Sequence, residues 1–280
     1  MCLVLVGWRA HPEYRLIVAA NRDEFYTRAT ETLRWWPEAP DLLAGRDLGA
    51  GGEIPGTWLG VSPAGRRFAT VTNVRRPGEN RTDVRSRGAL LMDYLRGEVG
   101  PEKTVRAVAA EPDDYNGYNL VVSDLETLWW HSNRSGSAPR ELAPGFHGIS
   151  NDAVVGSAEP DSRDIRTGTE RPAWPKVREG VRALRSVVES TPGDIEGYLR
   201  VLADRTRALD TELPDTGLGR RMERTASARF IAHTVHGTRC STVLLVREDG
   251  GFEMVERSFG RFGRERDTRS YSGRIGLDPN

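Results

Sequence analysis

The sequence has little lysine and cysteine, no net charge and no long apolar run. Lys103 and Lys176 are the only lysines among forty basic residues, and forty acidic residues bring the net charge to zero. A neutral chain has no net field to attract nucleic acid or an anionic membrane surface, so we expect neither as a partner. No stretch approaches the roughly 18 apolar residues of a membrane-spanning helix, so we also expect no span.

The scarcity of cysteine excludes a disulfide framework, because only Cys2 and Cys240 are present. The first apolar run ends at Trp8 without the flanking residues of a secretory signal peptide. We therefore predict a cytoplasmic protein whose thiols stay reduced. In such a protein, a cysteine directly before an apolar strand calls for a chemical explanation.

The sequence does contain apolar runs of strand length, separated by turns and amphipathic stretches. Residues 3–8 and 16–20 indicate a first hairpin. Two more hairpins are predicted over residues 57–73 and 241–259, strands over 118–123 and 127–131, and helices over 88–96, 102–110, 176–188 and 194–204. Strands in hairpins and helices in pairs are typical of α+β proteins. We expect one domain over residues 1–280, a four-layer αββα sandwich of two antiparallel sheets flanked by helices.

Cys2 is the first candidate for chemistry. Removal of Met1 would make Cys2 the N-terminal residue, and its α-amine, with a pKa of about 7.7 to 8, would accept the thiol proton near neutral pH. Such a residue is nucleophile and base at once, so no catalytic histidine is required. The alternative is that Cys2 is a small buried residue at the start of a strand.

Four polar residues, from Asn21 to Glu24, follow the second apolar run. In an antiparallel hairpin the end of the second strand lies beside the start of the first, which places this cluster next to Cys2. Asp23 would hold an N-terminal ammonium group, and Arg22 would favour the thiolate. Asn21 and Glu24 are candidates for capping the loop or binding substrate, although a solvated turn would have the same composition.

Acyl transfer also needs hydrogen-bond donors that face a developing oxyanion. Asn73 and Asn151 each follow an apolar segment, where the rim of a site would lie. Arg239, just before the last hairpin, would be a second cation. Asparagine is also common in ordinary turns and arginine on surfaces, so these three roles are hypotheses that depend on Cys2.

Other patterns are weaker. His233 and His236 are three residues apart, but neither Cys240 nor another histidine completes a zinc spacing, so we expect no metal site. Trp35 and Trp36 precede a proline and could wall an apolar pocket, although such a pair more often packs in a core.

A series of short motifs runs through the chain in a fixed order. They are MCL at the N-terminus, AANRDE at 19–24, TNVR at 72–75, YNL at 118–120, HGISN at 147–151, WPK at 174–176 and RCSTVLLV at 239–246. The series resembles the NRDE family, also called the transport and Golgi organization 2 family. It is far more specific than NRDE alone, and it adds His147 of HGISN to the candidates for substrate binding.

This resemblance implies a fold similar to N-terminal nucleophile hydrolases of the choloylglycine hydrolase and penicillin V acylase type. It implies that Cys2 is the nucleophile and that Asp23 orients its amine. It further implies Asn73 and Asn151 in the site, with Asn151 as the oxyanion asparagine, and Arg239 as a late active-site arginine. Residues 152–173 look like an exposed insertion in the family pattern, placed where a loop would influence the choice of substrate.

We therefore expect an enzyme that cleaves an amide or related acyl bond, or transfers or cyclises the acyl group, through a thioester on Cys2. Its substrate would be a small acyl or amide compound, and no cofactor is expected. The alternative is a non-catalytic protein that binds haem or a lipid such as acyl-CoA, with Cys2 as a haem ligand or a structural residue.

Overall fold

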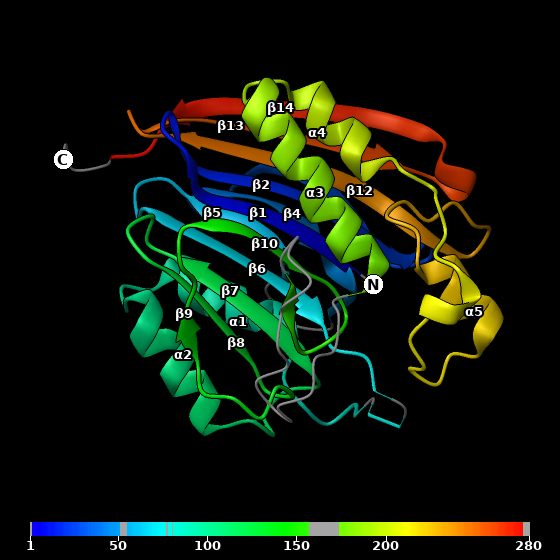
Figure 1. Cartoon of the computed structure of the whole chain (residues 1–280). Coiled ribbons are helices and arrows are strands. Elements are labelled where there is room, and N and C mark those ends of the chain that lie inside the picture. Colours follow the sequence, from blue (N-terminus) through cyan, green and yellow to red (C-terminus); the bar gives the residue numbers. More distant parts are fainter. Residues whose placement is uncertain (1, 51–54, 77, 80, 157–173, 277–280) are drawn as a thin grey trace.

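Two antiparallel sheets, each with seven strands among the described residues, form the centre of the molecule (Figure 1). The computed structural model describes residues 2–50, 55–76, 78–79, 81–156 and 174–276. The first sheet has the order β11 (Val155–Gly156), β10 (Gly145–Ile149), β1 (Cys2–His11), β2 (Tyr14–Phe25), β12 (His236–Arg247), β13 (Gly251–Phe259) and β14 (Glu265–Arg274). The second sheet follows the chain: β3 (Thr30–Trp36), β4 (Ala39–Asp47), β5 (Leu59–Ser62), β6 (Arg67–Asn73), β7 (Tyr118–Ser123), β8 (Leu128–Ser132) and β9 (Arg140–Glu141).

The sheets pack face to face because alternate side chains of each central strand enter different apolar cores. In β1, Val4 and Val6 belong to the core between the sheets, whereas Leu3 and Leu5 belong to the core under the helices. Both faces of β1 and β2 are therefore buried, which explains their nearly continuous apolar sequences. The hairpin predicted from these sequences is confirmed.

Helices cover the outer faces of the sheets (Figure 1). α3 (Pro175–Ser190) and α4 (Ile195–Leu202) pack on the first sheet, and α1 (Arg87–Arg96) and α2 (Pro101–Ala110) pack on the second. α5 (Arg220–Ala226) follows them in the chain. The four predicted helices are confirmed within two residues at each end. This order of layers is compatible with the expected αββα sandwich.

The structure adds strands that the sequence pattern does not indicate. β3 and β4 form a hairpin that brings Trp36 into the core under α1. β14 is an edge strand with the charged sequence ERDTRSYSGR, and it is mostly exposed, so it needs no apolar alternation. Most of the predicted insertion, residues 157–173, lies outside the described residues, and the part before it ends in β11.

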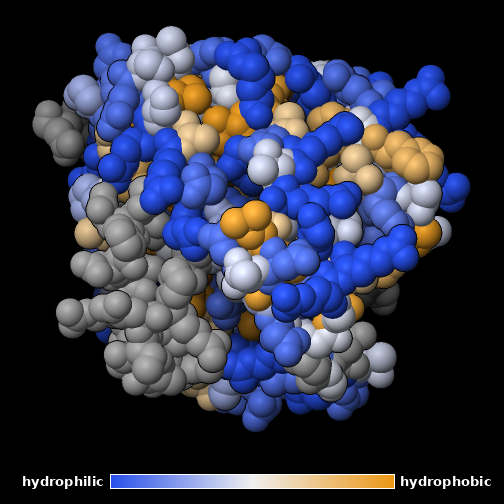
Figure 2. All heavy atoms as spheres, turned by 45° about the vertical axis from the view of Figure 1, so that its right-hand side comes forward, coloured by the Kyte–Doolittle hydropathy of each residue, from blue (hydrophilic) through white to orange (hydrophobic). Residues whose placement is uncertain are grey.

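The face seen in Figure 2 is mostly hydrophilic, and hydrophobic residues occur on it in groups interrupted by hydrophilic ones. Among the helices that the structure describes, none is long and apolar enough to cross a membrane.

Candidate active site

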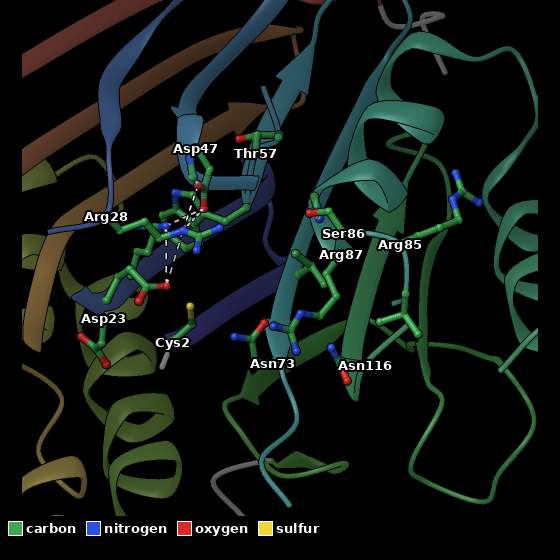
Figure 3. A pocket seen from close by; sticks show the side chains of 18 residues that line it. Cys2, Asp23, Arg28, Asp47, Thr57, Asn73, Arg85, Ser86, Arg87 and Asn116 are labelled. Carbon is green, nitrogen blue, oxygen red and sulfur yellow. Dashed lines mark hydrogen bonds and ion pairs between the residues drawn. The ribbon is translucent and has the colours of Figure 1, made fainter. Parts of the chain in front are cut away.

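A charged cavity of about 250 Å³ lies where several strands end beside the start of α1 (Figure 3). Its walls come from the start of β1, the ends of β2, β4 and β6, and residues 84–88, which lead into α1. Most of the lining surface is polar. Because drug-sized ligands occupy roughly 300–1,000 Å³, a cavity of this size fits a small polar molecule.

Cys2 begins β1, and its side chain, 7% exposed, lies in the wall of this cavity. The hairpin register places Arg22 directly opposite Cys2, so the two side chains share the face between the sheets. Burial raises the pKa of the Cys2 thiol, and the positive charge of Arg22 opposes that rise. The structure thus brings together the thiol and the cation that the sequence placed at two strand ends.

Asp47, at the end of β4, holds the arginines of this wall. It accepts a hydrogen bond of 2.7 Å from Arg22 and bonds of 2.9 Å from Arg28. Glu24 lies 3.8 Å from Arg22 and 4.0 Å from Arg28, and it also lines the cavity. These contacts connect the end of β2 in the first sheet to β4 in the second, and they fix the guanidinium of Arg22 beside Cys2.

Asp23 also lines the cavity, but its contacts lie towards β12 and α3. It is 1% exposed, and its Oδ1 accepts a 2.7 Å hydrogen bond from the Thr238 hydroxyl. Burial raises the pKa of the Asp23 carboxyl, while the positive charge of Lys176 and the hydrogen bond from Thr238 oppose the rise. An acid in this position suits the predicted role of holding an ammonium group at residue 2.

The two predicted amides occupy different positions. Asn151 is buried beneath Cys2: its Oδ1 lies 3.4 Å from the Cys2 backbone nitrogen, and its Nδ2 donates to the Asn73 carbonyl oxygen at 2.8 Å. The Asn73 side chain lines the cavity beside Cys2 and makes no hydrogen bond within the described residues (Figure 3). Asn73 is therefore the amide with a free donor at the cavity surface, and Asn151 fixes the backbone on both sides of the site.

Asn21, expected to bind substrate or cap a loop, is instead a structural residue. Its side chain is 0% exposed and belongs to the face of β2 that lies under the helices. It donates to the carbonyl oxygens of Leu202 at 2.9 Å and Arg229 at 2.8 Å, and it accepts from the Ser241 hydroxyl at 2.6 Å. Both N–H groups and the oxygen are used within the protein, so the amide is not available to a substrate.

Arg239 and His147 also lie away from the Cys2 cavity. Arg239 is the extra residue of a bulge in β12, and it donates to the carbonyl oxygens of Phe25 and Arg28 at the turn after β2. His147 lies in β10 opposite Val6, and its Nε2 is 2.8 Å from the Ala143 carbonyl oxygen. Neither side chain lines the cavity, so the structure does not bring these two predicted residues to Cys2.

The paired tryptophans do not form the expected pocket wall. Trp36 is 1% exposed in the core between the second sheet and its helices, and its Nε1 donates to the Ala44 carbonyl oxygen at 3.0 Å. Trp35 packs edge-to-face against Tyr271 of β14. Trp58 is the aromatic residue that lines the cavity.

Cys240 lies on the other side of Arg22 from Cys2 and lines a separate cavity of about 110 Å³ together with Arg239. Burial and the negative charge of Glu256 raise the pKa of the Cys240 thiol well above its usual range. The two cysteines are free thiols. No group of three or more His, Cys, Asp and Glu side chains in the described part of the chain is placed to hold a metal ion.

Several cations near Cys2 are not among the predicted site residues, and Lys176 and Arg87 are two of them. Lys176, in the first turn of α3, is buried, and its Nζ has no hydrogen-bond partner among the described residues. Arg87, the first residue of α1, lines the cavity. The WPK motif gave a signal for Lys176, but Arg87 lies in the unremarkable stretch RSRG, and only the tertiary structure brings it to Cys2.

Fold and site together define an α+β protein with two antiparallel sheets and a thiol-lined, charged cavity at the start of its first strand. A family model described as "Transport and Golgi organisation 2" matches residues 1–261. The chain therefore belongs to the Transport and Golgi organisation 2 family, as the motif series predicted.

Curated relatives agree with this assignment. The chain is similar to "Transport and Golgi organization protein 2 homolog" of Bos taurus, with 33% identity over 279 residues that cover 92% of this chain and 93% of the bovine one. It is 31% identical over 277 residues to the Homo sapiens protein of the same name, with the same coverage of 92% and 93%. "Transport and Golgi organization protein 2" of Drosophila melanogaster is 34% identical over 99 residues, which cover 34% of this chain and 35% of that protein.

Proposed function

We propose that this protein is an N-terminal cysteine nucleophile enzyme that acts on an amide or related acyl bond, by hydrolysis or by acyl transfer. The observation that carries the proposal is the position of Cys2 in the wall of a charged cavity, with Arg22 directly opposite and Asp23 beside it. Two facing antiparallel sheets with outer helices and a nucleophile that begins a central strand also suit an N-terminal nucleophile hydrolase.

In the first half of the proposed reaction, removal of Met1 exposes the α-amine of Cys2, and Asp23 holds that group. The amine takes the thiol proton as the sulfur attacks the acyl carbonyl carbon. The Asn73 side chain donates to the oxyanion that forms. As the C–N bond breaks, the α-ammonium returns its proton to the leaving amine, and the acyl group remains on Cys2 as a thioester.

In the second half, water or an acceptor amine attacks the thioester carbonyl, and the α-amine takes the proton of the attacking group. The C–S bond then breaks, the acid or the new amide leaves, and the proton returns to the Cys2 sulfur. Water as the acceptor gives hydrolysis, and an amine gives acyl transfer or, if it is tethered to the acyl group, cyclisation.

A haem or lipid carrier has less support from the site. A porphyrin or a lipid chain needs an apolar pocket, whereas the cavity beside Cys2 has a mostly polar lining that includes seven charged residues. Trp35 and Trp36, which would have provided apolar walls, pack elsewhere in the molecule.

The first experiment is intact mass of the purified protein, before and after brief treatment with iodoacetamide at pH 7. We expect a mass without Met1, one fast label, and peptide mapping that places the label on Cys2 and not on Cys240. Cys240→Ser should label like the natural protein, and Cys2→Ser should not label in the same time.

A matched control separates the free amine from mere accessibility. The same protein with one extra residue before Cys2 keeps the thiol and removes its α-amine. Without the α-amine to take its proton, the Cys2 thiol should have a pKa higher by at least about one unit. Since one pKa unit changes the thiolate fraction about tenfold, we expect labelling of Cys2 to slow by at least roughly that factor. Retained Met1, or equal labelling rates in the two forms, would contradict the proposed base.

A further inference from the structure

The charges around the cavity are not evenly balanced between its walls. Four arginines and three acids line it: Arg22, Arg28, Arg85, Arg87, Asp23, Glu24 and Asp47. All three acids come from the ends of β2 and β4, on the wall that carries Cys2. Arg85 and Arg87 come from the opposite wall, residues 84–88. The wall facing Cys2 therefore carries positive charge and no carboxylate of its own.

The arginines differ in whether an acid compensates them. Arg22 and Arg28 both bind Asp47. Arg85 forms a 2.9 Å ion pair with Asp93, on the exposed side of α1. Arg87 donates to the Gly117 carbonyl oxygen at 3.1 Å, and no carboxylate of the described residues lies within ion-pair distance of it. Arg87 is thus the cavity arginine without an acidic partner in the described part of the chain.

Arg87 is placed to reach a ligand bound at Cys2. Its side chain extends from the start of α1 towards Asn73, which lies next to Cys2 (Figure 3). Burial lowers the pKa of the Arg87 guanidinium, and the negative charge of Glu24 across the cavity opposes that shift. Arg87 also begins a ten-residue helix with Ser86 as its N-cap, so the positive end of the helix dipole adds to the field on this wall.

We propose that the substrate carries an anionic group, a carboxylate or a phosphate, that binds Arg87 while its acyl carbonyl lies at Cys2. This inference rests on the proposed function and names its substrate class. A half-buried guanidinium without a counter-ion is costly, and its planar pair of N–H donors matches carboxylate and phosphate oxygens. The anion would take the place of the acid that the described residues do not supply to Arg87, and it would fix the acyl group against the thiol.

The first test compares two alkylating reagents that differ in charge, anionic iodoacetate and neutral iodoacetamide. For each protein, the rate of Cys2 labelling by iodoacetate is divided by the rate by iodoacetamide. This ratio is then divided by the ratio measured for a short peptide with an N-terminal cysteine, which removes the difference in intrinsic reactivity between the two reagents. We expect Arg87→Gln to lower this normalised ratio about fivefold, through loss of a nearby cation. Arg182→Gln, on the exposed side of α3 and paired there with Glu179, is the control and should leave the ratio unchanged. An unchanged ratio in Arg87→Gln would overturn the proposal.

A second test does not use the thiol. The thermal midpoint is measured in acetate, inorganic phosphate and chloride at equal ionic strength, because a bound anion stabilises the folded state. We expect acetate or phosphate to raise the midpoint over chloride, and Arg87→Gln, but not Arg182→Gln, to lose the increase. The more effective anion distinguishes a carboxylate from a phosphate substrate. Equal midpoints in all three salts, or an increase that survives in Arg87→Gln, would refute anion binding. An inert Cys2 would refute the proposed function alone.

Discussion

Replacing Asn21 with alanine should destabilise the fold rather than remove a substrate contact. The Asn21 side chain bonds the buried carbonyl oxygen of Leu202 on α4, the partly buried carbonyl oxygen of Arg229 before β12, and the buried Ser241 hydroxyl on β12. Each of the two fully buried partners left without its hydrogen bond costs about 1–3 kcal/mol, so we expect Asn21→Ala to lower the free energy of unfolding by about 2–6 kcal/mol. This is a large fraction of the roughly 5–15 kcal/mol that stabilises an ordinary domain.

The assay is urea unfolding followed by tryptophan fluorescence. With a urea slope of about 2–3 kcal/mol per molar, the expected loss moves the midpoint down by about 1–3 M. Asn73→Ala is the matched control, since the Asn73 side chain lines the cavity and makes no hydrogen bond within the described residues. Its unfolding free energy should stay within about 0.5 kcal/mol of the natural protein.

The pair of variants makes the assignment refutable. If Asn21→Ala unfolds at the same urea concentration as the natural protein, the hydrogen bonds of Asn21 do not hold α4 and β12 to the sheet. If Asn73→Ala instead shows the large loss of stability, then Asn73 is the structural residue, and the assignment of Asn21 to the fold and of Asn73 to the cavity is wrong.

Two further predictions concern α3. Burial lowers the pKa of Lys176 to about 8, against 10.5 ordinarily. Between these pH values the unfolded chain binds more protons than the native state, so the stability of the fold rises with pH. Lys176→Met should remove the rise in urea midpoint from pH 8 to 10, and a rise that persists in this variant would come from another group. A Cβ on Gly148 would lie 2.6 Å from Val177, so Gly148→Ala should cost about 1–3 kcal/mol in a urea titration. Gly276→Ala, with no atom within 4 Å of the added Cβ, is the control and should not lower stability. Equal losses in the two variants would refute the close packing of α3 on β10.

Local patterns predicted the parts of the site that one hairpin brings together. Apolar runs and a turn were enough to pair β1 with β2, and antiparallel pairing then placed Arg22 and Asp23 near Cys2. The alternation of side chains between the two faces of β2 contained a further signal. Asn21 continues the face of Ile17 and Ala19, which packs under the helices, so its side chain points away from the inter-sheet face of Cys2.

The other parts depend on contacts that no local pattern specifies. Arg87 reaches the cavity because α1 begins against Gly56 and Thr57 of a distant segment, and nothing in its own sequence indicates that neighbour. Arg239 was expected at the site, but the bulge between Thr238 and Cys240 makes it an extra residue in β12, free to bind the turn after β2. Such one-residue irregularities change where a side chain goes without changing the apolar pattern around it.

The pairing of the first strand with late parts of the chain has a consequence for the timing of maturation. Cys2 contacts Asn151, 149 residues later, and Asp23 contacts Thr238, 215 residues later. Because a chain is synthesised from its N-terminus, β1 and β2 stay uncovered at one edge or both until most of the protein has been made. The removal of Met1 that the proposed reaction requires would take place in that period, before Cys2 becomes buried. A purification tag therefore belongs at the C-terminus, since an N-terminal tag would block this processing in every molecule.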